Sequence, residues 1–541
     1  MFLGRSELSP FVPSKGLGWS PLKIDRLTQL LISYPNKQEA EALITNLEVG
    51  HSLHYSGPSQ SRWSQNLQSA RQNPDLALQK IMKEVQMGRM AGPFTSVRET
   101  GLESLIISPV GLVPKSNGGE RLIHHLSHPW GEGVNSYIDD EQSKVSYASF
   151  DQALRTIAGF GQGTRLAKVD VKSAYRLLPI REDDFQCLGL HIGDTIFVDK
   201  MAPMGAKISA AHWEAFGRVW VWLIHQRPDF KGATCRYMDD LLIMCPPSDN
   251  DPMASVRAVC ELSQEIGLPL AQEKTVLPTT EIVFLGLTID SNSLTIKVPE
   301  DKRQAVKNEL EKLLERRNVK VRKILSITGK LNFLCKAIPA GRPFMRGMFD
   351  SVKGLAKHTW AKVTERAKED ALMWLNFLES FNGTTKFSPM VLPCPPDADV
   401  FTDASLRGYG IVFGQHWVMQ KFPDFETEPS MTWRELYPIL VALSIFEEDL
   451  QNKRVRFNTD NSGVFHILQS LTSPVDEIMQ LIRPITLQCL RLNISIATNF
   501  VPTDKNLLAD PLSRLCPQVF LQRAPDADPH PTPVPPHLTF F

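Results

Sequence analysis

Two adjacent carboxylates, Asp239 and Asp240, stand in a segment whose residue types suit metal chemistry. A glycine-containing approach over residues 232–237 precedes them, and the apolar run 241–244 follows. This pattern predicts a β-hairpin with both acids at its tip. Adjacent like charges repel, and hard oxygen ligands suit Mg²⁺, so a divalent ion is the natural counter-charge. For an isolated pair, the alternative is an ordinary Asp-Asp turn.

A third carboxylate, Asp170, ends an apolar segment earlier in the chain. Residues 166–171 predict a short buried strand, and residues 172–176 are expected to continue it. Taken alone, Asp170 could equally be a helix cap or a turn residue. Two strands that bring Asp170 and Asp239 together would form a two-metal site. Such a site can activate a 3′-hydroxyl and bind a triphosphate during an in-line displacement.

Four further acids stand at the ends of predicted elements in the C-terminal part of the chain. Asp403 lies on a strand, Glu435 opens a helix, Asp460 ends a strand and Asp510 lies at a helix start. Each has a plainer interpretation. Glu435 follows Thr432 by three residues, as in a capping box, and Asp460 and Asp510 could each cap a helix.

The first group of segments resembles the palm motifs of reverse transcriptases, in the same order and at similar spacing. Five matches carry the resemblance: Asp-Val-Lys-Ser-Ala-Tyr at 170–175, Pro-Met-Gly-Ala-Lys at 203–207, Tyr-Met-Asp-Asp at 237–240, Gln-Glu-Lys-Thr at 272–275 and Phe-Leu-Gly at 284–286. The resemblance implies that Asp170, Asp239 and Asp240 are catalytic. It also implies that these acids and Val171 hold the polymerase metals, with Asp240 in support.

A predicted hairpin over residues 109–123, with an Asn-Gly-Gly turn, resembles the fingers hairpin whose Lys and Arg hold the incoming triphosphate. Lys115 and Arg121 fit those places, and a pair of solvated charges is the alternative. The resemblance implies that the nucleotide is bound by these two residues and by Tyr175, Met204, Gly205 and Lys274. Tyr175 would lie under the sugar, although it could also be a core residue. His124 and His125 are interpreted as structural residues rather than metal ligands.

The four C-terminal acids together resemble the Asp-Glu-Asp-Asp set of ribonuclease H. That resemblance implies that Asp403, Glu435, Asp460 and Asp510 are catalytic metal ligands that hydrolyse the RNA strand of a hybrid. One departure concerns a histidine that related retroelement enzymes often carry just before a Val-Pro segment. Residues 499–502 here are Asn-Phe-Val-Pro, so slower cleavage is expected rather than none.

Further segments are most similar to DIRS-like retrotransposons, namely residues 92–94, 107–109, 121–126, 145–151, 329–335 and 341–343. The expected function is RNA-directed DNA polymerisation of retroelement RNA together with ribonuclease H cleavage. The implied cofactor is Mg²⁺ or Mn²⁺, with two ions per active site. The implied partners are an RNA template, a DNA primer, the RNA–DNA hybrid, deoxynucleoside triphosphates and a separately encoded tyrosine recombinase. The alternative is a decayed or host-adopted copy that binds nucleic acid without polymerising.

The fold class that follows is a multidomain α+β and α/β protein, in which a right-hand polymerase precedes a ribonuclease H-like domain. At 541 residues the chain is long enough for several cores. The expected parts are an N-terminal helical lead (1–85), fingers and palm (86–298), a helical thumb (299–354), a connection with a Pro-rich linker (355–398), a ribonuclease H-like domain (399–516) and a disordered Pro-rich tail (517–541). One connecting helix is expected to contain both Trp360 and Trp374.

The formal net charge is zero, so nucleic-acid binding must come from local basic patches. The clearest patch consists of Lys302, Arg303, Lys307, Lys312, Arg316, Arg317, Lys320, Arg322, Lys323 and Lys330. Its position after the palm predicts a thumb that contacts the duplex backbone. A solvated helix face, offset by Glu309, Glu311 and Glu315, is the alternative.

The eight cysteines form no Cys-x-x-Cys pair and no cluster with histidine, so zinc is not expected. Their pattern favours a reduced intracellular setting, cytoplasmic or nuclear. The apolar stretches are too short to cross a bilayer, and no secretory signal is expected at the N-terminus. We therefore expect no association with membranes.

Overall fold

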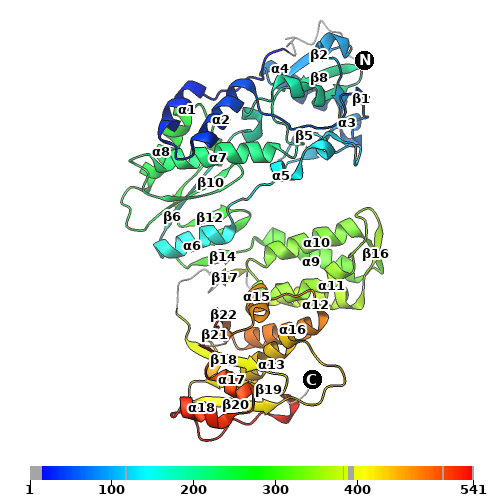
Figure 1. The fold of residues 1–541 in the computed structure, drawn as a ribbon. Coiled ribbons are helices and arrows are strands. Elements are labelled where there is room, and N and C mark those ends of the chain that lie inside the picture. The colour runs from blue at the N-terminus through cyan, green and yellow to red at the C-terminus, as the bar shows by residue number, and fades with distance from the viewer. Residues whose placement is uncertain (1–14, 116–117, 382, 388–394, 503–504, 539–541) are drawn as a thin grey trace. The chain divides into compact units, whose positions relative to one another are not determined.

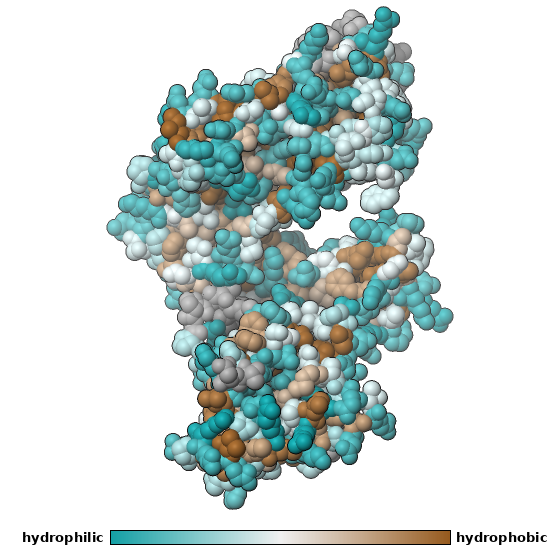
Figure 2. All heavy atoms as spheres, viewed as in Figure 1, coloured by the Kyte–Doolittle hydropathy of each residue, from teal (hydrophilic) through white to brown (hydrophobic). Residues whose placement is uncertain are grey.

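The computed structural model describes residues 15–115, 118–381, 383–387, 395–502 and 505–538. The chain forms two compact units, Met1–Ile282 and Val283–Phe541. In the face drawn in Figure 2, hydrophilic residues cover much of the surface and apolar residues form smaller patches. Among the described residues, no helix combines the length and the apolar character needed to cross a membrane.

The first unit is centred on a four-stranded antiparallel sheet of order β11-β6-β10-β9 (Figure 1). Its strands are β6 (Arg165–Asp170), β9 (Ala233–Tyr237), β10 (Asp240–Cys245) and β11 (Val276–Thr279). The last five residues of β10 are all buried, because α6 (Phe150–Phe160) and α8 (Pro252–Glu265) both contact this strand. A strand covered on both faces needs a continuous apolar run, which explains the sequence that follows Asp240.

Helix α7 (Ser209–His225) carries Trp213, Phe216 and Trp220 among its buried residues, at the spacing of one helix face. The other helices of this unit are α1 (Ile24–Leu30), α2 (Lys37–Val49), α3 (Gln68–Gln72), α4 (Pro74–Gln86) and α5 (Asp140–Ser143). A second sheet, of order β1-β3-β7-β8-β2, contains β1 (Arg62–Trp63), β2 (Met90–Phe94), β3 (Ile106–Ile107), β7 (Gly189–Ile192) and β8 (Thr195–Asp199). The predicted hairpin is confirmed as β4 (Val110–Pro114) and β5 (Glu120–His124), although its turn residues 116–117 lie outside the described residues.

The second unit begins with two small sheets and a group of helices that pack on one another (Figure 1). The helices are α9 (Glu300–Leu314), α10 (Val321–Leu334), α11 (Arg346–Asp350) and α12 (Glu365–Ser380). One sheet has the order β12-β13-β14-β17, with β12 (Glu281–Phe284), β13 (Leu287–Asp290), β14 (Thr295–Lys297) and β17 (Thr384–Lys386). The other pairs β15 (Asn318–Lys320) with β16 (Trp360–Lys362). Leu285 and Gly286, between β12 and β13, both have positive φ, as a type I′ turn requires.

A mixed five-stranded sheet of order β20-β19-β18-β21-β22 forms the rest of the second unit. Its strands are β18 (Ala398–Ala404), β19 (Gly408–Phe413), β20 (His416–Lys421), β21 (Arg454–Thr459) and β22 (Ser495–Phe500). The pairs β18–β19 and β19–β20 are antiparallel, whereas β18–β21 and β21–β22 are parallel. The helices are α13 (Met431–Ile445), α14 (Glu447–Leu450), α15 (Ser462–Ser470), α16 (Asp476–Arg491), α17 (Ala509–Ser513) and α18 (Pro517–Arg523).

The structure corrects three local predictions. The strand β6 ends at Asp170 instead of continuing, because Ser173 has a φ of 59° and a 3₁₀ helix, Ala174–Leu177, follows. Trp360 lies in β16, not in the helix that carries Trp374, since residues 360–362 pair with β15.

The third correction concerns the tail, which was expected to be disordered. Residues 517–523 form α18, and Phe520 is buried against Trp417, with ring centroids 5.1 Å apart. Trp417 Nε1 donates to the carbonyl of Asp528 at 2.7 Å, and the Tyr437 hydroxyl donates to the carbonyl of Leu538. Within the described residues, Phe520 and the carbonyls of Asp528 and Leu538 thus have partners on the five-stranded sheet and α13, which proline content alone does not reveal.

Candidate active sites

The pairing of β6 with β10 brings the first group of acids to one end of the central sheet. Asp240 lies directly opposite Asp170 in this ladder and opposite Tyr237 in the β9–β10 ladder. Asp239 occupies the β9–β10 turn, and its carbonyl accepts a hydrogen bond from Val171 N at 2.9 Å. The predicted hairpin with both aspartates at its tip is therefore confirmed, and Asp170 lies beside it.

Helix α7 supports the turn that carries Asp239. Met238 has a φ of 55°, and its carbonyl accepts hydrogen bonds from Trp213 Nε1 at 2.8 Å and Arg236 Nη1 at 2.9 Å. The buried Arg236 also pairs with Glu214 of the same helix. The roles of Trp213 and Glu214 could not be predicted from the sequence, because they depend on where α7 crosses the hairpin.

Two lysines offset part of the negative charge of the three acids. Lys274 Nζ lies 2.9 Å from Asp170 Oδ1, and Lys168 Nζ lies 3.6 Å from Asp240 Oδ1. Burial raises the pKa of Asp239, and the Asp170 charge raises it further. Burial likewise raises the pKa of Asp240, against the opposing effect of Lys168. The chain's own cations therefore leave Asp239 in an environment that favours an added positive charge.

The predicted nucleotide-binding residues differ in how far they are buried and in what links them to this end of the sheet. Lys115 and Arg121 are exposed on the β4–β5 hairpin, and the Arg121 charge is near enough to lower the pKa of Asp239. Tyr175 is half-buried and packs against the main core of the first unit. Its pKa is raised by burial, by Tyr147 and by Asp239, so its hydroxyl lies in the same neighbourhood.

Gly205 is required by the close approach of the chain to His124. A Cβ atom at Gly205 would lie 1.6 Å from the carbonyl oxygen of His124. Asn135 stabilises this approach, since its side chain donates to the Gly205 carbonyl at 2.8 Å and accepts from Lys207 N at 3.0 Å. His124 is buried and its Nε2 lies 3.1 Å from the Gly189 carbonyl, which agrees with a structural role. Met204, beside Gly205, is 47% exposed.

The C-terminal acids form a tighter group. Within the described part of the chain, Asp403, Glu435 and Asp460 are the one set of three potential metal ligands whose atoms all lie within 4.8 Å of one another. They come from β18, from α13 and from the residue after β21. Burial and the Asp460 and Asp510 charges raise the pKa of Asp403 to about 7, against the opposing effect of Ser513.

Glu435 is the most buried member of this group, with 4% of its surface exposed. Burial and the charges of Asp403 and Asp460 raise its pKa to about 9, although the backbone of Ala404 donates to its carboxylate. Its Oε2 atom has no hydrogen-bond partner. A buried, unpartnered carboxylate oxygen beside two more carboxylates fits a cation better than it fits a structural role.

Asp510 approaches the group from α17 and is paired with Arg514 at 2.8 Å. Gly410, opposite Asp403 in the β18–β19 ladder, allows this approach. A Cβ atom at Gly410 would lie 2.7 Å from the Ala509 carbonyl oxygen, so a larger residue would displace α17. Asp510 is recognisable in the sequence, whereas the role of Gly410 in positioning it is apparent only in the fold.

The helix-capping interpretations of these acids are wrong. Helix α13 begins after Ser430, whose side chain accepts from Trp433 N at 3.3 Å, so Thr432 and Glu435 form no capping box. Helix α15 is capped by Asn461 rather than Asp460, and the residue before α17 is Leu508. In the Asn-Phe-Val-Pro segment at 499–502, Asn499 donates to Asn458 Oδ1 at 2.9 Å.

Several cations of the predicted basic patch are engaged within the protein. Lys323 and Lys330 both pair with Glu309, at 2.6 and 2.9 Å. Lys302 donates to the Gly286 carbonyl at 2.8 Å, and Lys307 lies 3.9 Å from Glu379. The alternative of a helix face offset by acids thus holds for part of the patch, through Glu309.

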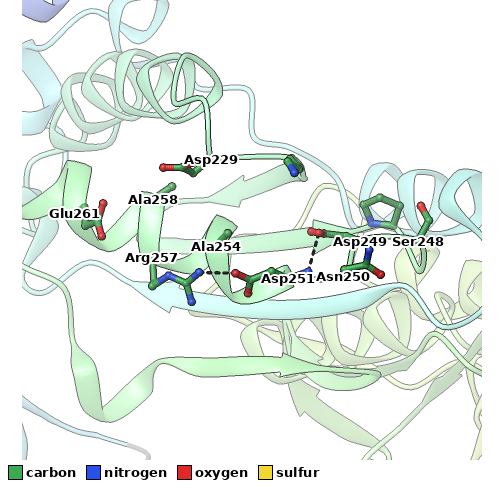
Figure 3. Close-up of a pocket in the computed structure, with 11 residues that line it drawn as sticks. Asp229, Ser248, Asp249, Asn250, Asp251, Ala254, Arg257, Ala258 and Glu261 are labelled. Carbon is green, nitrogen blue, oxygen red and sulfur yellow. Dashed lines mark hydrogen bonds and ion pairs between the residues drawn. The ribbon is translucent and has the colours of Figure 1, made fainter.

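A cavity of about 630 Å³ lies at the other end of β10 from the aspartates. It is lined by residues that follow this strand and by α8, including Asp249, Asp251 and Arg257 (Figure 3). Arg257 Nη2 lies 2.6 Å from Asp251 Oδ2, and Asp251 N donates to Asp249 Oδ1 at 3.1 Å. None of these lining residues belongs to either carboxylate group.

Residues 113–289 match the family model described as reverse transcriptase (RNA-dependent DNA polymerase). The Tf2-3 and Tf2-7 transposon polyproteins of Schizosaccharomyces pombe (strain 972 / ATCC 24843) are 23% and 22% identical to this chain over 458 residues. The alignments cover 82% of this chain and 31% of each polyprotein, so the chain spans about a third of the length of these curated relatives.

Solved structures of a foamy viral protease-reverse transcriptase are among those similar to this chain. The one in complex with double-stranded DNA, named dRH, has a TM-score of 0.49 at 15% identity and covers 92% of this chain and 86% of that chain. The one in complex with an RNA/DNA hybrid has a TM-score of 0.48 at 15% identity, with 90% and 64% covered. From the family match, the chain contains a reverse transcriptase domain at residues 113–289, and the chain as a whole is similar to transposon polyproteins. The DIRS-like subtype stays a prediction.

Proposed function

We propose that the chain is an RNA-directed DNA polymerase that copies retroelement RNA into DNA. The observation that carries the proposal is the β6–β10 register, in which Asp240 faces Asp170 and the adjacent turn presents Asp239. This arrangement lies within residues 113–289, the segment that matches the reverse transcriptase family. The substrates would be an RNA template, a DNA primer and deoxynucleoside triphosphates.

The donor set at this end of the sheet suits hard divalent cations. Asp170, Asp239 and the carbonyl of Val171 would hold two Mg²⁺ or Mn²⁺ ions, with Asp240 in support. Bound at such carboxylates, divalent ions neutralise charge on the attacking and leaving oxygens of an in-line displacement. Lys274 contacts Asp170 at 2.9 Å and would keep this carboxylate oriented.

The remaining residues of the site would bind and orient the nucleotide. Lys115 and Arg121 would contact the triphosphate from the β4–β5 hairpin, where neither side chain is buried. Met204 and Gly205 would line the pocket, since the glycine keeps the chain close to His124 and leaves no side chain in the way. Tyr175 would lie under the sugar ring.

For the second carboxylate group we propose ribonuclease H activity, which hydrolyses the RNA strand of an RNA–DNA hybrid. The proposal is supported by the clustering of Asp403, Glu435 and Asp460 and by the unpartnered Oε2 of Glu435. These three acids would hold two ions, and Asp510, paired with Arg514, would complete the set. The segment 499–502, Asn-Phe-Val-Pro, would supply no histidine, so cleavage would be slower rather than absent.

We assign the polymerase fingers and palm to residues 86–298, the thumb to 299–354, the connection to 355–398 and the ribonuclease H-like domain to 399–516. The assignment is supported by the α9–α10 pair and by the span of the five-stranded sheet, whereas the division of the chain after Ile282 places residues 283–298 in the second unit. A separately encoded tyrosine recombinase stays a prediction from the DIRS-like resemblance.

The test is primer extension by the purified chain on a poly(rA) template with Mg²⁺. Asp239→Asn should lower extension at least about 100-fold, because removing a ligand disturbs charge neutralisation in the transition state. Binding of a hybrid duplex should stay unchanged. Asp249→Asn is the matched control, since Asp249 lines the cavity at the other end of β10. Normal extension by Asp239→Asn would overturn the assignment. A wild-type chain that binds hybrid without extending it would favour the decayed or host-adopted copy.

A further inference from the structure

The two-stranded ribbon of β15 and β16 has one face turned to solvent. In its register, Asn318 pairs with Lys362, Val319 with Ala361 and Lys320 with Trp360. Side chains alternate along a strand, so Val319 and Ala361 share the opposite face, and both are buried. Lys320, Trp360 and Lys362 are all exposed.

The ribbon joins two segments that are far apart in the sequence. Val321 N donates to the Thr359 carbonyl at 3.0 Å, Arg322 N to the Lys357 carbonyl at 3.2 Å, and Val363 N to the Arg317 carbonyl at 2.9 Å. Figure 1 shows β16 at the end of α9 and α10 where these helices are connected. Residues of the predicted basic patch therefore meet cations from residues 353–363, which the sequence analysis did not include.

The combined segments, 315–323 and 353–363, carry a strong excess of positive charge. They contain eight lysines and arginines and one acid, Glu315, in a chain whose net charge is zero. Within the described residues, Lys323 is the one of these cations with an ion pair, to Glu309. The others are exposed: Arg316, Arg317, Lys320, Arg322, Lys353, Lys357 and Lys362. Unneutralised cations gathered in one place are the electrostatic feature that attracts phosphate backbones.

Trp360 adds a feature that charge alone does not explain. Its side chain is 60% exposed, and Lys320 Nζ lies 5.6 Å from its ring centroid. An exposed aromatic ring beside cations is the arrangement on which unpaired bases stack. The bases of a duplex are already stacked on one another, so the phosphates of a duplex would contact the cations, but no base would stack on the ring.

We propose that this ribbon surface, consisting of Arg317, Lys320, Arg322, Lys357, Trp360 and Lys362, binds single-stranded nucleic acid. A base stacks on Trp360, and the lysines and arginines contact the phosphates on either side. The inference rests on the proposed function for the class of ligand, an unpaired stretch of the template. The surface itself lies on elements that contribute no residue to either carboxylate group.

The test measures fluorescence anisotropy of the full chain with a labelled oligo(U), an oligo(dT) of equal length and a blunt RNA–DNA duplex. Trp360→Ala should weaken binding of both single strands about tenfold, since stacking of one base contributes about that much, and should leave duplex binding unchanged. Trp360→Phe should retain most of the affinity. Trp19→Ala is the matched control, because Trp19 is also 54% exposed beside a cation, with Arg89 Cζ 6.0 Å from its ring centroid.

A second variant tests the cations without touching the ring. Lys320→Gln combined with Lys362→Gln changes two exposed residues. It should reduce the slope of log affinity against log salt by about 1.4 for single strands, because each neutralised phosphate contributes about 0.7 to that slope. Unchanged affinity in Trp360→Ala, or an unchanged slope in the lysine variant, would overturn the proposal. Equal reductions in affinity for duplex and single strands in Trp360→Ala would also overturn it. If the wild-type chain fails to extend primers yet shows these effects, the proposed polymerase function fails and the ribbon inference stands.

Discussion

The guanidinium of Arg236 lies against Gly217 of α7, where a Cβ atom would be 2.2 Å from Arg236 Cζ. Arg236 is buried, pairs with Glu214 and donates to the Met238 carbonyl in the turn that presents Asp239. The absence of a side chain at position 217 therefore determines how closely the aspartate hairpin approaches α7. A glycine inside a helix costs about 1 kcal/mol relative to alanine, so its presence needs such a reason.

The first prediction is that Gly217→Ala lowers primer extension at least about tenfold, because the methyl group displaces Arg236 and the turn it supports. Ribonuclease H cleavage should be unchanged, since its residues lie in the other unit. The measurement is single-turnover extension on one primer–template. Gly159→Ala in α6 is the control, because a Cβ atom there meets nothing within 4 Å. Normal extension by Gly217→Ala would show that Arg236 is free to move aside.

The second prediction separates catalysis from helix capping at α13. Glu435→Gln should abolish metal-dependent cleavage of RNA in a hybrid and leave extension intact, since the amide carries no charge for a metal. Ser430→Ala removes the observed N-cap and should lower the free energy of unfolding by about 1 kcal/mol, with cleavage retained. The two variants are compared by hybrid cleavage and by thermal melting. Persistent cleavage in Glu435→Gln would remove this acid from the proposed site.

The third prediction concerns the pH dependence of stabilisation by Mg²⁺. The pKa values of Asp403 and Glu435 are raised to about 7 and about 9. The folded state therefore binds more protons than the unfolded state, and the stability that this protonation contributes is present below the unfolded pKa values, near 4. It is lost as the pH rises through 7 and then 9. A bound cation replaces the protons, so the stabilisation by Mg²⁺ should grow over the same range.

The measurement is the melting temperature of the full chain with Mg²⁺ and with EDTA, from about pH 6 to about pH 9. The difference between the two conditions should increase with pH. In Glu435→Gln the increase above pH 7 should largely disappear, because the group with the higher pKa no longer titrates. A difference in melting temperature that stays constant with pH in the wild-type chain would contradict the proposal that these clustered acids bind a cation.

Sequence reasoning located the acids because their signal is local. Asp239 follows a strand pattern, and residue period and turn chemistry are properties of neighbouring residues. The residues that position these acids were missed, since their role depends on contacts between distant segments. Gly217 lies 19 residues before Arg236 on a different element, and Gly410 lies about 100 residues before Asp510. A glycine in a helix or strand signals a close approach without indicating what approaches.

For the same reason, the link between α12 and α16 could not be predicted from the sequence. Asp370 is fully buried, accepts from Gly347 N at 2.6 Å and pairs with Arg483. Burial raises its pKa to about 6, against the opposing effect of Arg483. In the sequence, Asp370 is an ordinary acid on a helix, and only the fold shows that it joins the connecting helix to a helix that packs with the five-stranded sheet.

The last prediction concerns sugar selection by Tyr175. This residue follows Asp170 by five positions and packs partly against the core, while Asp239 and Tyr147 help to raise its pKa. A ring under the sugar leaves no space for a 2′-hydroxyl, and a steric clash discriminates better than a missing hydrogen bond. Tyr175→Val should raise ribonucleotide incorporation relative to deoxyribonucleotide at least about tenfold, or about 1.4 kcal/mol of selectivity. Tyr175→Phe keeps the ring and should keep the selectivity. The measurement is single-nucleotide insertion kinetics with both sugars on one primer–template. If Tyr175→Val still inserts deoxyribonucleotides and the ratio of ribonucleotide to deoxyribonucleotide incorporation is unchanged, then Tyr175 only packs against the core and does not select the sugar.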